Sequence, residues 1–501
     1  MDYSYPLLCA CERNPARIAL IGPGENVSFA ELEDRIAAMA GGFVATGIGG
    51  SAVGVMMSNT PAVVVVLMAL ARANCIAVPI NTRLTAKEQS VIVVDAAVER
   101  IVADDAQAER AGRLLGSDGG VIAVTGSPFA GDTLTALAGR GTPVKPCADS
   151  DGDDRIATVT YTSGTTGTPK GVQRTHRANT WNAVNSALGS PRDSNDVELF
   201  NLPAFGIGFV HFVLPALIGG ATVVLDEAFD AVRVWQLIER HRVTRTFLAP
   251  TMISAMLSVP AEQRSDTSSL TTIYTAYAFP SRLRAAALQE FGDVFVYMYG
   301  LTEAQLTCAV ADQFRSDPTN VGVPMGVARI GAFDEDGNKV GPNSVGEIGF
   351  SGPSTMTGYH QRPDETAAVV RGEWVMTGDL GTVDDNGHLR YVGRLKEIIK
   401  TGGFSVDPFE VEEVILELPT VSEVAVVGVA DDHWGEAIVA FAVTSGTDLG
   451  VDEVREFCRD KISGFKAPKA LFNVEELPKN ATGKIDRGRL RGLAASLYPT
   501  G

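Results

Sequence analysis

The sequence has little positive charge for its size. Its 501 residues include 42 lysines and arginines against 60 aspartates and glutamates, which gives a formal net charge of −18. Proteins that bind nucleic acids usually present basic surfaces, so this balance argues against a nucleic-acid partner. Any anionic ligand must therefore meet a local positive site.

Cysteine is also scarce. The six cysteines are scattered, and only Cys9 and Cys11 lie close together, without the second pair that would complete a metal site. The six histidines show no metal-ligand spacing either. We therefore expect reduced, mostly buried cysteines and a cytoplasmic location.

Long apolar runs are missing as well. The N-terminal stretch MDYSYPLLCACERNP begins acidic and soon returns to charged residues, which excludes a signal peptide. The most apolar segment, residues 62–80, is interrupted by Arg72 and Asn74, so a buried helix followed by a strand suits it better than a membrane span. We expect no membrane passage.

What the sequence does contain is an alternation of helical and strand-like patterns. Residues 29–47 precede the β-branched run 51–58, and residues 234–243 precede the strand-like run 244–250. Such alternation is typical of an α/β fold with mainly parallel sheets and helices on their faces. We predict a large N-terminal domain of this class over residues 1–395.

The pattern changes near Gly393. Upstream of it, residues 346–353 and 387–394 indicate short strands separated by Gly, Asp and Asn turns, as in a small β-rich subdomain. Downstream, the patterns indicate a compact α+β unit, and we predict a small mobile C-terminal domain over residues 396–501. The short charged linker at residues 395–397 suits a hinge.

One short stretch, YTSGTTGTPKGV from Tyr161 to Val172, combines glycines, hydroxyls and a single lysine. Glycine lets the backbone bend, and successive N–H groups in such a bend form a concavity suited to anions, so phosphate is the indicated ligand. A Walker A loop is excluded because Pro169 precedes the lysine and Gly171 follows it. The alternative is an ordinary surface loop rich in Gly, Ser and Thr.

This stretch resembles the phosphate-binding signature of the adenylate-forming superfamily, which contains acyl-CoA synthetases, luciferases and peptide-synthetase adenylation domains. Other segments resemble the superfamily's later motifs, in the right order: YGLTEA from Tyr299, WVMTGDLG from Trp374, GRLKEIIKTGGFSVDPFEVEEVI from Gly393 and LPKNATGKIDRGRL from Leu477. The resemblance covers almost the whole chain. It implies a two-step reaction in which a carboxylate and ATP give an acyl-adenylate and pyrophosphate, and a thiol then displaces AMP.

The resemblance also implies individual roles at an ATP and Mg²⁺ site. Lys170 would neutralise the terminal phosphates, Thr302 would contact the α-phosphate, Glu303 would lie on the Mg²⁺ side, and Asp379 and Arg394 would bind the ribose. Without the resemblance, Thr302 and Glu303 could simply start a helix and Asp379 could belong to a turn. The other nucleotide-binding positions implied are Thr162, Ser163, Gly164, Thr165, Thr166, Gly167, Ala276, Tyr277, Ala278, Tyr299 and Gly300.

The motifs near the C-terminus resemble moving parts of the superfamily. Lys484 would enter the site during adenylation and bridge the carboxylate and the α-phosphate, although a lysine near a chain end is otherwise usually solvated. Lys396 would be the hinge position. After rotation of the small domain, Gly402 and Gly403 would face the site and let the pantetheine thiol of coenzyme A approach closely.

Two departures from the superfamily pattern bear on substrates. In the loop expected to bracket adenine, Ala276 and Tyr277 replace glycines. Tyr277 would stack on adenine, shape the acyl pocket or obstruct ATP if it points inward, and would be neutral if it points outward. In LPAFGIGF, Gly206 follows Phe205 where the superfamily often has histidine; this either enlarges the acyl pocket and alters thiol access, or only accommodates the backbone.

The leading hypothesis is an AMP-forming acyl-CoA ligase that uses a small carboxylic acid, ATP and CoA. The alternatives are an enzyme that mainly thioesterifies a pre-made acyl-adenylate, a ligase that loads a separate carrier protein, and a catalytically silent nucleotide-binding protein. Because the chain ends soon after Lys484, we expect no fused carrier domain and free CoA as the acceptor. The sequence sets neither the acid nor the oligomeric state.

Overall fold

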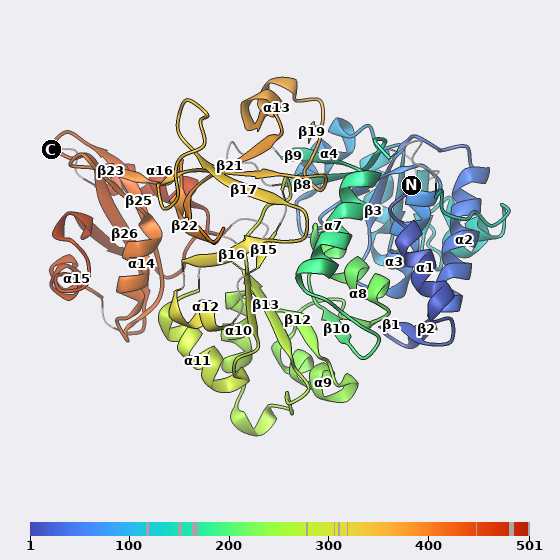
Figure 1. Cartoon of the computed structure of the whole chain (residues 1–501), viewed down its shortest axis with the longest axis horizontal. Coiled ribbons are helices and arrows are strands. Elements are labelled where there is room, and N and C mark those ends of the chain that lie inside the picture. Colours follow the sequence, from blue (N-terminus) through green and yellow to red (C-terminus); the bar gives the residue numbers. More distant parts are fainter. Residues whose placement is uncertain are drawn as a thin grey trace.

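The computed structural model describes residues 1–116, 120–148, 153–162, 169–276, 279–304, 306–308, 311–317, 319–446, 448–479 and 485–498. Among these residues the strands form four sheets, three before residue 395 and one after it. Figure 1 shows the last sheet at the left, beside the C-terminus and set apart from the other three.

The first sheet includes β8 and β9, the two strands on which the phosphate motif begins and ends. Its strand order is β19-β9-β8-β4-β3-β5-β6-β7, parallel from β8 to β7 and antiparallel from β8 to β19. The strands are β3 (Ala52–Met56), β4 (Ile76–Pro79), β5 (Arg100–Ala103), β6 (Val121–Ala123), β7 (Asp132–Thr133), β8 (Ile156–Thr162), β9 (Lys170–Thr175) and β19 (Gly358–Tyr359). The helices of this region are α2 (Phe29–Ala45), α3 (Pro61–Arg72), α4 (Ala86–Asp95), α5 (Ala108–Leu115), α6 (Leu134–Ala138) and α7 (His176–Gly189).

The second sheet has the order β14-β13-β12-β10-β11-β1-β2 and is parallel except for the β1–β2 pair. Its strands are β1 (Ile18–Gly22), β2 (Glu25–Ser28), β10 (Val197–Phe200), β11 (Thr222–Leu225), β12 (Arg245–Phe247), β13 (Thr272–Ala276) and β14 (Phe295–Met298). The accompanying helices are α1 (Tyr5–Arg13), the π-helix η3 (Phe209–Val213), α8 (Leu214–Gly219), α9 (Ala231–His241), α10 (Pro250–Leu257) and α11 (Ser281–Phe291).

The third sheet is the antiparallel, β-rich part, with the order β15-β16-β22-β21-β18-β17 and β20 paired to β21. Its elements are β15 (Thr307–Cys308), α12 (Ala311–Ser316), β16 (Asn320–Pro324), β17 (Arg329–Phe333), β18 (Gly346–Ser351), α13 (Pro363–Val369), β20 (Val370–Arg371), β21 (Trp374–Val383) and β22 (Leu389–Arg394).

The fourth sheet belongs to the C-terminal unit, with the order β24-β23-β26-β25 and β27 paired to β26. Its elements are β23 (Ile399–Thr401), β24 (Phe404–Val406), α14 (Pro408–Leu416), β25 (Val421–Asp431), β26 (Gly435–Thr444), α15 (Val451–Cys458), β27 (Ala470–Asn473) and α16 (Arg487–Leu497). Short 3₁₀ helices span Asp105–Gln107, Ala261–Gln263 and Gly464–Lys466.

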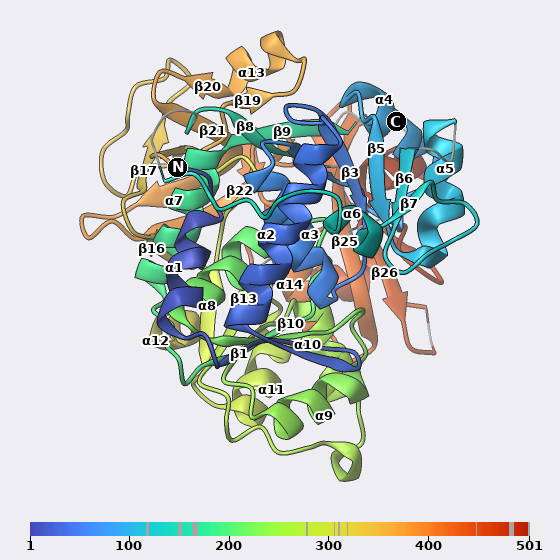
Figure 2. The same cartoon turned by 90° about the vertical axis from the view of Figure 1, so that its right-hand side faces the viewer.

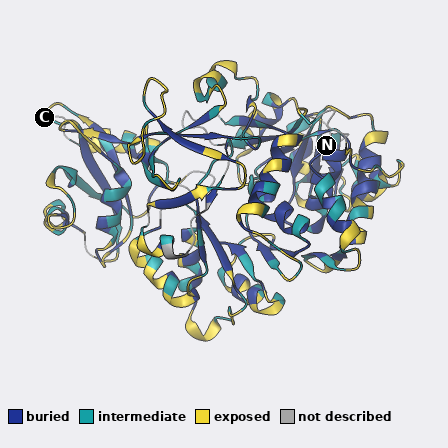
Figure 3. Cartoon of the chain, in the orientation of Figure 1, coloured by how far each residue is buried: buried dark blue, intermediate teal, exposed yellow. Residues whose placement is uncertain are grey.

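The main core lies between the first two sheets. In Figure 2 helices α2 and α3 run side by side, and α3 is buried over almost its whole length because its residues are nearly all apolar. Figure 3 shows the same division, with buried strands inside and exposed residues on the outer helices. The α/β class predicted from the sequence is confirmed, and so is a separate C-terminal unit.

Residues 395–398 lie between β22 of the third sheet and β23 of the fourth. The sequence placed the domain boundary and the hinge here, and that these residues act as a hinge stays a prediction. None of the helices formed by the described residues has the length and apolarity needed to cross a bilayer.

Candidate active site

The phosphate motif lies on the hairpin formed by β8 and β9. Thr162 ends β8 and pairs with Lys170, the first residue of the antiparallel strand β9. Ser163, Gly164, Thr165, Thr166 and Gly167 lie outside the described residues. Thr162 and Lys170 therefore place a hydroxyl and an ammonium group on two neighbouring, paired strands.

Lys170 has two neighbours from a distant part of the sequence. Its Nζ lies 2.5 Å from Oε2 of Glu365 on α13 and 5.1 Å from the ring centre of Tyr359 on β19. Tyr359 also donates a hydrogen bond from its hydroxyl to Oε1 of Glu303, at 3.0 Å. One aromatic side chain thus connects the predicted phosphate-binding lysine with the predicted acidic residue, which is consistent with one common site.

The backbone at Thr302 and Glu303 is fixed from both sides. Arg174, whose side chain is fully buried, donates from Nη1 to the carbonyl of Thr302 at 2.9 Å. The N–H of Met356 donates to the carbonyl of Glu303 at 2.9 Å. Burial lowers the pKa of Arg174 to about 10, so the guanidinium stays charged at neutral pH.

Asp379 is the best-defined group of the site. It is only 3% exposed, and it accepts a hydrogen bond from the Tyr299 hydroxyl at 2.7 Å and another from Nε of Arg394 at 3.1 Å. Burial raises the pKa of Asp379 above its usual value, while Arg394 and the Tyr299 hydroxyl oppose that shift. Each carboxylate oxygen has one donor and can still accept from further hydroxyls.

The loop that the sequence predicts to bracket adenine, which we call the adenine loop, begins where β13 ends. Ala276 is the last residue of β13 and pairs with Met298 on the parallel strand β14, and Tyr299 and Gly300 follow β14 directly. Because the carboxyl ends of neighbouring parallel strands meet at one edge of a sheet, the loop and the Tyr299–Glu303 segment leave this edge together. Tyr277 and Ala278 lie outside the described residues.

Arg394 is the last residue of β22 in the third sheet, directly before the C-terminal unit. Gly402 and Gly403 lie in the turn between β23 and β24 and are exposed, and both have a positive φ. The predicted hinge residue Lys396 accepts a hydrogen bond at its carbonyl from Arg491 on α16 at 3.5 Å. Lys484 lies outside the described residues.

The predicted acyl-pocket residues Phe205 and Gly206 lie in a partly buried segment between β10 and the π-helix η3. Burial lowers the pKa of His211, within that π-helix, to about 3, and within the described part of the chain neither ring nitrogen has a hydrogen-bond partner. π-Helical turns are often found at functional sites. That Phe205 and Gly206 line an acyl pocket stays a prediction.

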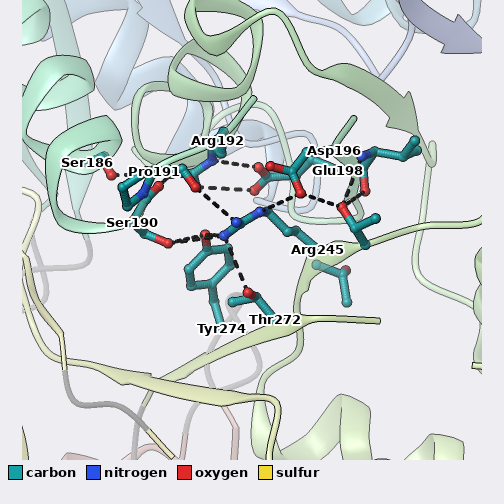
Figure 4. Close-up of polar contacts among 12 residues, drawn as sticks. Ser186, Ser190, Pro191, Arg192, Asp196, Glu198, Arg245, Thr272 and Tyr274 are labelled. Atoms are coloured by element: carbon teal, nitrogen blue, oxygen red, sulfur yellow. Dashed lines mark hydrogen bonds and ion pairs between the residues drawn. The ribbon is translucent and has the colours of Figure 1, made fainter. Parts of the chain in front are cut away.

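Beside this segment a buried polar network joins α7 to the second sheet (Figure 4). Arg192 pairs with Glu198 at 2.8 Å, and Arg245 pairs with Asp196 at 2.9 Å and donates to the Tyr274 hydroxyl at 3.1 Å. Since Tyr274 lies two residues before Ala276, this network holds the strand from which the adenine loop begins.

The sequence pointed to the residues of the motifs but missed their supports. Arg174, Tyr359 and Glu365 belong to none of the motifs that we singled out. The roles of Tyr359 and Glu365 appear only because β19 pairs with β9, and that of Arg174 because it contacts the Thr302 carbonyl. Among the residues that the structure describes, no group of three His, Cys, Asp or Glu side chains is arranged as metal ligands.

Comparison with known proteins covers nearly the whole chain. Residues 9–360 match the family described as AMP-binding enzyme, and residues 410–484 match the AMP-binding enzyme C-terminal domain. A feruloyl-CoA synthase from an Amycolatopsis species is 35% identical over 95% of this chain and 96% of that protein. An indoleacetate–CoA ligase from Aromatoleum aromaticum is 33% identical over 96% of each.

A solved structure, the amide bond synthetase McbA from Marinactinospora thermotolerans, superimposes with a TM-score of 0.88 at 29% identity. The superposition covers 98% of this chain and 99% of that one. The likeness therefore includes both the large unit and the C-terminal unit.

Proposed function

Because this chain belongs to the family of AMP-binding enzymes, we propose that it is an AMP-forming acyl-CoA ligase. It joins a carboxylic acid to ATP to give an acyl-adenylate and pyrophosphate, and CoA then displaces AMP to give the acyl-CoA and a proton. The observation that carries this function is the buried carboxylate of Asp379, held by Tyr299 and Arg394 next to the Thr302–Glu303 segment. Full-length relatives named as CoA ligases support it.

Asp379 would bind the ribose of the nucleotide. Its oxygens already receive one donor each, and their remaining lone pairs suit the two ribose hydroxyls. Burial makes hydrogen bonds to this carboxylate stronger than they would be in water. The adenine would then lie against the loop that begins at Ala276, because that loop leaves the same sheet edge as Tyr299.

The phosphates would extend from Thr302 toward Lys170. Attack of a carboxylate on the α-phosphorus brings negative groups together, so catalysis must come from positioning and charge neutralisation. Lys170 would hold the β- and γ-phosphates and then the leaving pyrophosphate, together with the Thr162 hydroxyl and the rest of the phosphate motif. The Thr302 hydroxyl and Lys484 would contact the α-phosphate, and Lys484 would also contact the attacking carboxylate.

Mg²⁺ fits at Glu303, because this ion is commonly held by one or two carboxylates together with substrate phosphates and waters. Bound with ATP, it would neutralise phosphate charge during the transfer. The hydrogen bond from Tyr359 fixes one carboxylate oxygen of Glu303 and orients the other.

The second half-reaction would need the C-terminal unit to turn. The turn at Gly402 and Gly403 is exposed in this structure, and a rotation at Lys396 would bring it to the nucleotide. A few backbone dihedrals at 395–397 suffice for such a rotation, since the segment belongs to neither sheet.

The test is acyl-CoA formation by the purified full-length chain. Ferulate, indole-3-acetate and 2-succinylbenzoate begin the acid screen because relatives are named for them. Acyl-CoA, AMP and pyrophosphate are measured with acid, MgATP and CoA, and in parallel with synthetic acyl-AMP and CoA. A third arm replaces CoA with an amine, because a similar solved structure is an amide bond synthetase.

We expect acyl-CoA from both inputs, with one AMP and one pyrophosphate released per acyl-CoA in the ATP-driven arm. Turnover only from acyl-AMP would favour an enzyme that receives a pre-made adenylate, and a calorimetric titration of MgATP into the parent and Tyr277→Gly would show whether Tyr277 blocks the nucleotide. Product with the amine but not with CoA would contradict the proposed acceptor. Binding of MgATP without turnover of any acid or acyl-AMP would contradict a ligase.

A further inference from the structure

The segment Gly358–Thr366 folds tightly against the phosphate hairpin. β19 pairs antiparallel with β9, and the N–H of His360 donates to the carbonyl of Gly171 at 2.7 Å. Thr366 closes the segment on itself: its Oγ1 accepts from the N–H of Tyr359 at 2.9 Å and donates to the carbonyl of Arg362 at 2.8 Å. The segment is therefore a defined structure rather than a loose loop.

Its backbone includes a conformation that side chains rarely adopt. Gln361 has a φ of 51°, in the left-handed region. Such a conformation is unfavourable for a residue other than glycine and occurs often at functional sites. The turn at Gln361 carries the chain from Tyr359 to Arg362 and α13, so that Tyr359 and Glu365 both contact Lys170.

This geometry places one carboxylate between two cations. Oε2 of Glu365 lies 2.5 Å from Nζ of Lys170, and Oε1 of the same side chain lies 3.8 Å from Nε of Arg362. Arg362 is itself oriented by Asp95, whose Oδ1 lies 2.9 Å from its Nη2. Asp95 in turn accepts a hydrogen bond from the Tyr161 hydroxyl on β8 at 2.6 Å.

We propose that Arg362 is a second cationic ligand of the nucleotide's terminal phosphates, and that Glu365 occupies their place until nucleotide binds. The inference rests on the proposed function, in which Lys170 binds these phosphates. A carboxylate and a phosphate offer the same oxyanion chemistry to an ammonium and a guanidinium group, and Arg is well suited to phosphate because it presents several donors in a fixed plane.

The ion pairs of Glu365 with Lys170 and Arg362 are weak enough for phosphate to replace the carboxylate. The side chains of Lys170, Arg362 and Glu365 are 22%, 31% and 40% exposed, so solvent screens their attraction. The terminal phosphates of ATP carry more charge than one carboxylate and outcompete it. Glu365 swings aside on its flexible side chain, while Asp95 keeps Arg362 in position and the ring of Tyr359 keeps Lys170 in position.

Replacing Glu365 removes the competitor. Because a partly exposed ion pair contributes modestly, Glu365→Gln should bind pyrophosphate and MgATP up to about fivefold more tightly than the parent. Replacing Arg362 removes a ligand, so Arg362→Gln should bind both about tenfold more weakly, as expected for loss of a charge-assisted hydrogen bond. Arg362→Lys keeps the charge and should fall between parent and Arg362→Gln.

AMP separates a phosphate role from a structural one. AMP has no β- or γ-phosphate, so Glu365→Gln and Arg362→Gln should each change the affinity for AMP by no more than about twofold. Damage to the fold of the site would weaken AMP as well. Asp364→Asn, which removes a carboxylate from the exposed neighbouring position of α13, controls for the general change in charge.

The experiment is a calorimetric titration of MgATP, magnesium pyrophosphate and AMP into the full-length chain and these four variants. Tighter binding by Glu365→Gln and weaker binding by Arg362→Gln, with AMP and Asp364→Asn unchanged, support the proposal. Unchanged pyrophosphate affinity in both variants, or equal losses for AMP and pyrophosphate, overturn it. A parent that binds neither MgATP nor AMP would instead contradict the proposed function, so the two failures are distinguishable.

Discussion

Asp407→Asn tests how charge at the boundary of the C-terminal unit controls its stability. Asp407 is the N-cap of α14 and accepts a hydrogen bond from the N–H of Phe409 at 3.2 Å. Its carboxyl group also packs against Gly393, one residue before the ribose-binding candidate Arg394, because a Cβ on Gly393 would lie 3.0 Å from the carboxyl carbon. The substitution keeps the shape and the capping acceptor, since Asn caps helices as well as Asp does.

The magnitude follows from the pKa of Asp407. Burial raises this pKa from 3.8 to about 7, and the neighbouring Glu412 adds to the shift while Arg487 opposes it. Between pH 4 and pH 7 the folded chain keeps a proton that the unfolded chain has released, so stability falls as pH rises through this window and stays low above it. The full shift corresponds to about 4 kcal/mol, and partial exposure of the residue reduces the expected value to about 1–3 kcal/mol.

Asn carries no charge at any of these pH values. We therefore expect Asp407→Asn to stabilise α14 by ~1–3 kcal/mol at pH 8, with the gain shrinking steadily toward pH 4. The assay is hydrogen exchange of peptides covering residues 408–416, compared between variant and parent at each pH so that intrinsic exchange rates cancel. Asp230→Asn, at the exposed N-cap of α9, controls for loss of a capping carboxylate.

A gain of the same size at pH 5 and pH 8 would refute the reasoning, because it would show that the carboxylate is not titrating in this window. A loss of protection at pH 8 would show that the charged form is favoured by its surroundings, against the burial on which the expectation depends.

Three further predictions concern the nucleotide groups. Tyr299→Phe removes a hydrogen-bond donor to the ionised Asp379 and so raises the pKa of that carboxyl further. The affinity for AMP, measured by calorimetry, should fall about tenfold, and the loss should be larger at pH 6 than at pH 8. Equal losses at both pH values would argue against the ionised carboxylate as acceptor. Lys484→Ala should slow adenylate formation by at least about a hundredfold. Thioester formation from acyl-AMP, measured in a separate half-reaction assay, should change less than about threefold. Equal losses in the two half-reactions would contradict a role of Lys484 confined to adenylation. Arg174→Met leaves the Thr302 carbonyl and other buried acceptors without a hydrogen-bond donor. The free energy of unfolding should therefore fall by ~2–4 kcal/mol, measured as a lower Tm together with a lower kcat. An unchanged Tm would contradict the role of Arg174 in holding the Thr302–Glu303 segment.

The fold class was predictable because periodicity reports which face of an element is buried. The segment 62–80, with its unbroken valines, was predicted as a buried helix followed by a strand, and it forms α3 and β4. The change of pattern near Gly393 likewise marked the passage from β22 to the C-terminal unit. Both inferences use local information, which the sequence carries directly.

The supports of the site were not predictable, because they depend on contacts between residues far apart in the chain. Nothing local indicates that Tyr359 contacts both Lys170 and Glu303, since the contact requires β19 to pair with β9. Arg174 follows the phosphate motif, yet its role depends on the Thr302 carbonyl. The motifs indicated which residues are candidates to bind the nucleotide, whereas tertiary packing decides which other side chains hold these residues in position.

The pairing of β9 with β19 also determines how long β9 stays incompletely paired while the chain grows on the ribosome. Gln173 and His360, which contact each other in the finished fold at 3.0 Å, are 187 positions apart. At about 5–20 residues per second, synthesis of that interval takes roughly 10–40 s, during which β9 has one unpaired edge. An exposed strand edge is a template for pairing with other chains. Nascent or truncated chains that stop before Gly358 should therefore need protection by chaperones, and Lys170 reaches its final surroundings only after α13 has been made.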